Sequence, residues 1–206
     1  MEFWTQPVTR SGRHVRLEPL AMEHAPGLRA ALLDGHLWRL WYTAVPTPET
    51  IEAYIETALQ GQAAGTDLPF VVRDGAGEIV GCTRYCRIEQ ANHRLEIGYT
   101  WYAQRVQRTA LNTEAKRLLL GHAFDALACI AVEFRTHRFN HQSRRAIERL
   151  GAQFDGMLRC HQRAANGSLR DTAVYSITAD EWPSVRAHLD FQLTRSPHGA
   201  PQTPHG

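Results

Sequence analysis

The feature that most constrains the fold is residues 94–124, RLEIGYTWYAQRVQRTALNTEAKRLLLGHAF. Apolar residues alternate first and then recur at helical spacing, which predicts a strand that runs through a short turn into a helix. Such a junction directs unpaired backbone N–H groups and the positive end of a helix dipole at one point, where phosphate binds. Arg105 and Arg108 lie in the turn and would add charge for an anion. An ordinary connection with two solvated arginines fits the same residues.

Length and composition fit one globular domain with a substantial core, since 43% of the 206 residues are hydrophobic and 21% are charged. No apolar run approaches the ~18 residues of a membrane span. The N-terminus also lacks the basic and apolar regions of a secretory signal. We therefore expect a cytoplasmic protein without a membrane partner. The net charge of +2 gives no basic excess, which argues against a nucleic-acid partner.

The cysteines and histidines favour neither a disulfide framework nor a metal site. Cys82, Cys86, Cys129 and Cys160 match no zinc or redox spacing, so we expect free and mostly buried thiols. The eleven histidines are scattered along the chain, and we expect no bound metal.

The order of predicted elements indicates a mixed α/β fold, with a central sheet and helices on its faces. Strands are expected near residues 14–20, 68–74, 78–89, 93–102, 130–138, 153–162 and 170–178. Helices are expected near residues 22–34, 47–65 (beginning at a Thr47 cap), 111–127, 140–152 and 180–193. Residues 36–46 read as either a loop or a bent helix.

The domain is expected over residues 13–193, after an N-terminal extension at 1–12 and before a disordered tail at 194–206. The apolar strand near 172–178 suggests a homodimer interface.

Five segments in this order resemble the GCN5-related N-acetyltransferases, and in detail the branch of the ribosomal-protein N-terminal acetyltransferases. The segments are His14–Leu20, Leu95–Tyr99, Gln107–Ala115, Asn140–Ser143 with Glu148–Ala152, and Asp171–Ser176. The resemblance covers about residues 13–192. It implies an α+β fold with a mostly antiparallel sheet of about seven strands, helices on both faces, and acetyl-CoA as co-substrate.

In that family the turn usually runs Gln/Arg-x-x-Gly-x-Gly/Ala and holds the coenzyme A pyrophosphate. The resemblance places Gln107 first, Ala110 at the glycine and Asn112 last, so both flexible positions are filled. Arg108 is expected to compensate with its charge. The resemblance implies a set of coenzyme-binding residues: Gln107, Arg108, Thr109, Ala110, Leu111, Asn112 and Thr113, with Tyr99, Trp101, Asn140 and Arg144.

Acetyl transfer to an amine needs a base, and Glu96 is the candidate because it alternates with apolar Leu95 and Ile97 along its strand. The resemblance implies that this face opens on the substrate cleft. The alternative is an exposed carboxylate paired with Arg84 or Arg94.

Ser143 is the candidate proton donor to the departing sulfur, because the tyrosine usual in the family is replaced by Ile147. A local hydrogen bond on the first helical turn explains the serine equally well. Asn140 either contacts the coenzyme or caps its helix.

Trp38, Trp41 and Tyr42 fall where the family's acceptor-binding loop lies, so these side chains are expected to wall the substrate pocket. At least one tryptophan is expected to pack in the core instead.

The sequence thus predicts an N-acyltransferase that moves an acetyl group from acetyl-CoA to a primary amine, by direct attack in a ternary complex. The amine belongs to a protein N-terminus or a small molecule. A non-catalytic coenzyme-binding or protein-interaction domain, and an enzyme that uses another acyl-CoA such as succinyl-CoA, remain open.

Overall fold

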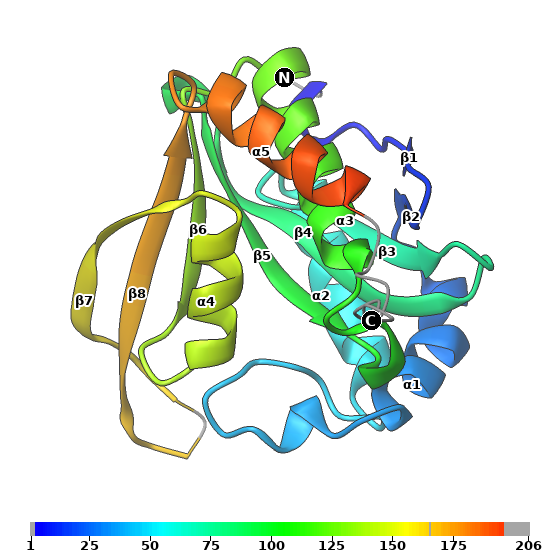
Figure 1. Ribbon diagram of the computed structural model, residues 1–206. Helices are drawn as coiled ribbons and strands as arrows, with labels where there is room; N and C mark the ends of the chain where they lie inside the picture. The colour runs from blue at the N-terminus through cyan, green and yellow to red at the C-terminus, as the bar shows by residue number, and fades with distance from the viewer. Residues whose placement is uncertain (1–2, 165, 196–206) are drawn as a thin grey trace, which may run out of the picture.

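The computed structural model describes residues 3–164 and 166–195. It confirms the predicted mixed α/β fold, in which one sheet runs in the order β1-β2-β3-β4-β5-β6-β8-β7 (Figure 1). The strands are β1 (Arg10–Ser11), β2 (Val15–Pro19), β3 (Leu68–Asp74), β4 (Ile79–Glu89), β5 (Arg94–Tyr102), β6 (Ala131–His137), β7 (Gln153–Arg163) and β8 (Leu169–Thr178). Neighbouring strands are antiparallel except for β5 and β6, which are parallel.

Helices cover both faces of the sheet. They are α1 (Ala25–Leu33), α2 (Ile51–Ala63), α3 (Ala110–Gly121), α4 (His141–Arg149) and α5 (Trp182–Thr194). In Figure 1, α3, α4 and α5 lie in front of the sheet, whereas α1 and α2 lie behind it. Tyr85 of β4 shows this layering, because its hydroxyl donates to the Leu119 carbonyl of α3 at 2.7 Å. Its neighbour Arg84 points the other way and stacks over Tyr54 of α2, as the alternation of side chains along a strand requires.

The sheet opens into a V between β5 and β6. The two strands pair only from Arg94 with Ala131 to Glu96 with Glu133. Beyond this point β5 continues to Tyr102 and β6 to His137 without pairing with each other. A bulge in β5 increases the divergence, because two residues, Tyr99 and Thr100, lie between its pairing positions Gly98 and Trp101.

The bounds of two helices differ most from the sequence prediction. The helix expected from Thr47 begins at Ile51, because Thr47 and Thr50 bond each other in a turn before it. The helix expected over 111–127 ends as α3 at Gly121 and continues as one π-helical turn, His122–Ala126. Residues 36–46 form a short 3-10 helix, Leu37–Arg39, and then an irregular loop.

The chain ends also refine the predicted domain. Residues before 13 contribute β1 and a 3-10 turn, Phe3–Thr5, whose Trp4 is buried in the core. Thr194 ends α5, and most of the predicted disordered tail, residues 196–206, lies outside the described residues. None of the helices in the described parts of the chain combines the length and apolar character that a membrane crossing requires.

The apolar strand that suggested a dimer interface is β8, an inner strand between β6 and β7. Its Ala173, Tyr175 and Ile177 are buried in the core, so packing within the chain accounts for their apolar character. Cys82, Cys86 and Cys129 are buried and Cys160 is exposed; all four are free thiols, as expected.

Candidate active site

The turn before α3 presents a set of unpaired backbone donors. Arg108 adopts the left-handed conformation at φ 61°, and Thr109 caps the helix by accepting from the Leu111 N–H at 3.3 Å. Among residues 3–164 and 166–195, the N–H groups of Arg108, Thr109 and Ala110 have no hydrogen-bond partner. Successive free N–H groups at a helix N-terminus form an anion-binding nest. The left-handed position of this turn is therefore occupied by Arg108. Ala110, which stands where the family usually has a glycine, is the first residue of the helix.

The side chains of this turn divide into free and engaged groups. The Gln107 amide donates to the Tyr102 carbonyl at 3.0 Å, which fixes the turn against the end of β5. Arg105 pairs with Asp34 and Asp74 at 3.4 Å each, so it stabilises the turn from outside. Arg108 is exposed and has no ion pair within the described residues. It is therefore the arginine of this turn that is free to meet an anion.

Three further residues of α3 were predicted to contact the coenzyme. Leu111 is buried in the core, and Thr113 is buried with its hydroxyl accepting from Arg149 at 3.3 Å. Asn112 is half-buried. Leu111 therefore offers an anion only backbone atoms, whereas Asn112 offers its side-chain amide.

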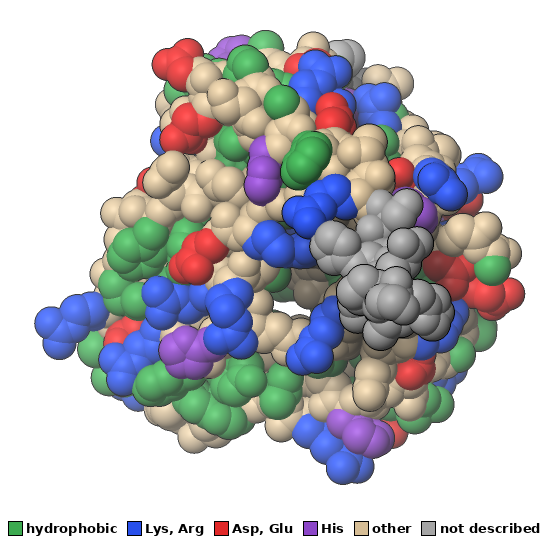
Figure 2. Space-filling model, in the orientation of Figure 1, with side chains coloured by type: hydrophobic (Ala, Val, Ile, Leu, Met, Phe, Trp, Pro, Cys, Tyr) green, Lys and Arg blue, Asp and Glu red, His purple; other side chains and the backbone are tan. Residues whose placement is uncertain are grey.

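The open V leads to a hole through the molecule. Figure 2 shows this opening between the positions that α4 and the loop at 36–50 occupy in Figure 1. Lys and Arg side chains gather along its rim. The opening therefore lies where β5 and β6 diverge, and cationic side chains surround it.

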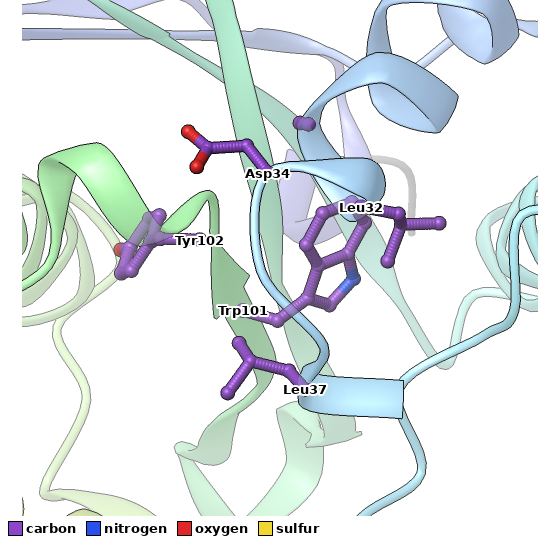
Figure 3. Close-up of a pocket in the computed structure, with 6 residues that line it drawn as sticks. Leu32, Asp34, Leu37, Trp101 and Tyr102 are labelled. Atoms are coloured by element: carbon purple, nitrogen blue, oxygen red, sulfur yellow. The ribbon is translucent and has the colours of Figure 1, made fainter. Parts of the chain in front are cut away.

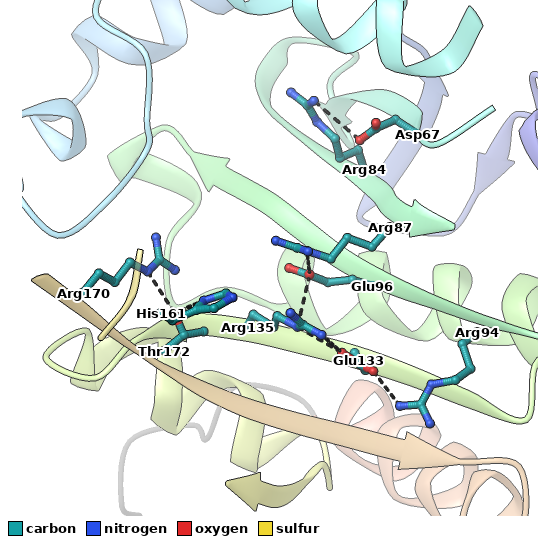
Figure 4. A network of polar contacts seen from close by, with 10 residues as sticks. All are labelled: Asp67, Arg84, Arg87, Arg94, Glu96, Glu133, Arg135, His161, Arg170 and Thr172. Carbon is teal, nitrogen blue, oxygen red and sulfur yellow. Dashed lines mark hydrogen bonds and ion pairs between the residues drawn. The ribbon is translucent and has the colours of Figure 1, made fainter. Parts of the chain in front are cut away.

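Glu96 lies on β5 at the point where the V begins, opposite Cys86 of β4 and Glu133 of β6. It is 7% exposed, and its Oε2 lies 3.1 Å from Arg87 Nε and 3.7 Å from Arg135 Nε (Figure 4). Burial raises the pKa of Glu96 to about 7 against the opposing effect of these arginines. The side chain can therefore accept a proton near neutral pH, which a base in acyl transfer requires.

Arg84 and Arg94, which the sequence suggested as ion-pair partners of Glu96, pair with other carboxylates. Arg84 faces Asp67 at 3.8 Å, and Arg94 pairs with Glu133. Glu96 is thus buried, and not the exposed carboxylate of the alternative prediction. Its ion-pair partners are Arg87 and Arg135.

Lys116 is a functional candidate that sequence reasoning missed. It is buried beneath the β5 bulge, where its ammonium donates to Thr100 Oγ1 at 2.6 Å and to Thr83 Oγ1 at 3.2 Å. Burial lowers the pKa of Lys116 to about 7. The available signal was its position one turn before Leu120 on the apolar side of α3, where a lysine is uncommon.

Tyr99 and Trp101 both lie in the bulged part of β5, but their side chains differ in role. Tyr99 has φ 51° and is half-exposed, with the Arg84 guanidinium 4.1 Å from its ring centre. Trp101 is buried against Leu32 and Leu37 in a crevice that leaves no room for a water molecule (Figure 3). Trp101 can therefore contact a ligand between β5 and β6 only through its backbone.

The start of α4 shows a cap. Asn140 Oδ1 accepts from the Ser143 N–H at 3.1 Å, which is the capping role expected as one of its two alternatives. The Ser143 side chain is half-buried, and its hydroxyl has no partner among the described residues. Arg144 donates to the Tyr175 hydroxyl at 2.8 Å, so it is engaged on the inner side of α4.

The aromatic loop reaches across to the end of β6. The Trp41 ring contacts His137 with centroids 5.1 Å apart and Phe139 at 6.1 Å. Tyr42 packs edge-on against Trp41, whereas Trp38 is half-buried against the core. The loop therefore closes the open end of the V, and Trp38 packs against the outside of the core.

Comparison with known proteins agrees with this geometry. The family model described as an acetyltransferase (GNAT) domain matches residues 14–153. A Bacillus subtilis protein provisionally named ribosomal N-acetyltransferase YdaF is 28% identical over 82% of this chain and 93% of its own length. The crystal structure of a GCN5-related N-acetyltransferase from Brucella melitensis superposes with a TM-score of 0.81 at 33% identity, covering 91% of this chain and 86% of that one. RimJ from Mycobacterium smegmatis, solved in complex with CoA-disulfide, shares the fold at 23% identity and a TM-score of 0.77, covering 93% of this chain and 97% of that one. The chain therefore belongs to the GNAT family of acetyltransferases.

Proposed function

We propose that this acetyltransferase moves an acetyl group from acetyl-CoA to the primary amine of a protein N-terminus or a small molecule, by direct attack in a ternary complex. The observation that carries the proposal is a buried carboxylate, Glu96, at the point where β5 and β6 separate. The proposal includes a cytoplasmic location, where acetyl-CoA and nascent proteins meet.

The turn before α3 fits the pyrophosphate of coenzyme A. The N–H groups of Arg108, Thr109 and Ala110, which have no partner within the described residues, lie at the start of the helix, and the Arg108 side chain adds a full positive charge. Backbone donors and a guanidinium together replace the flexible glycines that this turn usually contains. Gln107 supports this arrangement by holding the turn to Tyr102.

The bulged edge of β5 would hold the thioester. Beyond Glu96 this edge has no pairing with β6, so a backbone N–H between Tyr99 and Trp101 that points away from β4 would be available to a carbonyl oxygen. Fixed donors of this kind stabilise the negative charge that develops on the oxygen during attack. The bond from Lys116 to Thr100 keeps the bulge in place from behind.

Glu96 would take the proton of the attacking amine. The amine nitrogen bonds to the thioester carbon, the carbon–sulfur bond breaks, and Ser143 supplies a proton to the departing thiolate. An α-amino group titrates near about 8 and a lysine near about 10.4, so a base with a pKa of about 7 matches an α-amine better. The relative named as a ribosomal N-acetyltransferase makes a ribosomal-protein N-terminus the first acceptor to examine.

The test mixes purified protein, acetyl-CoA and a panel of peptide and small-molecule amines, and follows product mass and free thiol together. We expect one acetyl group on an amine and one equivalent of thiol for each product. Reactions without amine and with the Glu96→Gln variant are the controls. Stabilisation by acetyl-CoA without any amine product would instead identify a coenzyme-binding module.

A further inference from the structure

Arg170, near the start of β8, is a cation without an acidic partner inside the cleft. Its Nε donates to Thr172 Oγ1 at 3.2 Å, and no carboxylate among the described residues lies within 4.0 Å of it. The side chain is half-buried, and burial lowers its pKa. Its charged neighbours across the cleft are Glu96 and Arg87, and Figure 4 places its guanidinium on their side of the sheet.

The other arginines around Glu96 differ from Arg170 in this respect. Arg84 faces Asp67, Arg87 faces Glu96, and Arg135 pairs with Glu133 at 2.8 Å. The acid next to Arg170 in the chain, Asp171, pairs with Arg138 at 2.9 Å. Among the described residues, the Arg170 guanidinium therefore has no carboxylate in ion-pair contact, and a half-buried charge of this kind is costly unless a ligand supplies the anion.

Thr172 holds Arg170 ready for such a ligand. The Thr172 hydroxyl is buried and also bonds His161 Nδ1 at 3.0 Å, so two side chains of the β7–β8 hairpin are fixed by one group. Because the hydroxyl engages only Nε, the terminal nitrogens of the guanidinium have no hydrogen-bond partner in the part of the chain that the structure describes. A planar pair of N–H donors matches a carboxylate.

We propose that the acceptor amine carries a carboxylate and that Arg170 binds it while the amine faces Glu96. This inference rests on the proposed function and narrows its acceptor to anionic amines. Two sources have the required chemistry: an acidic side chain at a peptide N-terminus, and the carboxylate of a free amino acid.

Binding of the carboxylate would also tune the base. Arg170 lowers the pKa of Glu96 through its charge. A bound anion offsets that charge, so Glu96 becomes a stronger base when the correct acceptor is present. Arg170 is thus a specificity residue whose effect extends to the proton transfer.

The test compares matched acid and amide acceptors with acetyl-CoA as donor. One pair consists of peptides that begin with Asp or Asn, and the other of a free amino acid and its amide. We expect wild-type kcat/KM to favour the acid in at least one pair by about 10- to 100-fold, the range for a charge-assisted hydrogen bond. Arg170→Gln removes that preference, whereas Arg170→Lys retains part of it.

Arg163→Gln is the matched control, because it removes the same charge from the exposed end of β7, opposite Leu169 in the same hairpin. It should keep the full preference for the acid. Calorimetric titration of the preferred acid onto the complex with CoA gives a second readout that does not need turnover, and we expect binding to be lost in Arg170→Gln. Thermal melts of each variant establish that it is folded.

Turnover of acid and amide acceptors at equal rates would overturn this inference and leave the proposed function standing. So would an Arg170-dependent preference for succinyl-CoA over acetyl-CoA with neutral amines, since Arg170 would then bind the acyl chain. Absence of amine product with every acceptor would overturn the proposed function itself, and the inference with it.

Discussion

Replacing Glu96 with Gln should change the stability of the protein in a manner that depends on pH. The pKa of Glu96 is about 7 in the folded protein because burial disfavours its charge, whereas an unfolded glutamate titrates near about 4.3. The folded chain therefore binds a proton more tightly than the unfolded chain. The stabilisation from neutral Glu96 is complete below the unfolded pKa and is lost as the pH rises through about 7.

The magnitude follows from the two pKa values. Between pH 5 and pH 8 the free energy of unfolding of the wild type should fall by about 2.5 kcal/mol through this one group. The amide of Gln does not ionise, so the variant loses nothing over this range. The change in free energy of unfolding caused by Glu96→Gln should therefore shift by about 2.5 kcal/mol between these pH values, in favour of the variant at pH 8.

Urea denaturation followed by tryptophan fluorescence and circular dichroism at pH 5, 6, 7 and 8 measures this shift. Glu78→Gln removes the same charge from an exposed turn between β3 and β4 and controls for general charge effects. If Glu96→Gln instead destabilises the protein most at pH 8, the pairing of Glu96 with Arg87 and Arg135 outweighs its burial. That result would refute the pKa on which the base assignment depends.

Three further predictions concern α3 and the turn before it. Thr109→Ala should lower the free energy of unfolding by about 1 kcal/mol, measured in urea, because it removes the cap of α3; an unchanged value would show that the cap is not needed. Arg108→Ala should raise KM for acetyl-CoA about tenfold with kcat nearly unchanged, whereas Arg105→Ala, a control engaged with Asp34 and Asp74, should not; equal effects would contradict the role of Arg108. Wild-type stability should rise from pH 7 towards pH 9 through Lys116, because a folded pKa of about 7 lies below its unfolded value of about 10.4. Lys116→Met should remove that rise in pH-dependent urea melts and lower kcat, and a variant that keeps the rise would show that Lys116 is not its source.

The sequence predicted the elements of this fold well where local patterns decide them. Glu96 was placed on the face opposite Leu95 and Ile97 from alternation alone, and the structure confirms that Leu95 and Ile97 pack in the core. The strand pair around Asp74–Gly75 and the stop of α4 before Gly151, at φ 99°, followed from turn chemistry.

The site depended on features that local patterns do not contain. Arg87 reaches Glu96 only because the register of β4 and β5 shifts between Cys86 and Glu89. Lys116 finds hydroxyl partners only because the β5 bulge brings Thr100 beside Thr83. Register shifts and bulges arise from packing across strands, so residue spacing along one strand does not reveal these partners.

The most direct test of Glu96 as the base is the dependence of kcat on pH, measured with an accepted amine and saturating acetyl-CoA. If Glu96 is the base, wild-type kcat should rise through pH about 7 and level off above it. Glu96→Gln should lower kcat by about 100- to 10,000-fold and remove this limb of the profile. A Gln variant with unchanged turnover from pH 6 to pH 9 would contradict the role of Glu96 as base, because the proton would then leave the amine by another route.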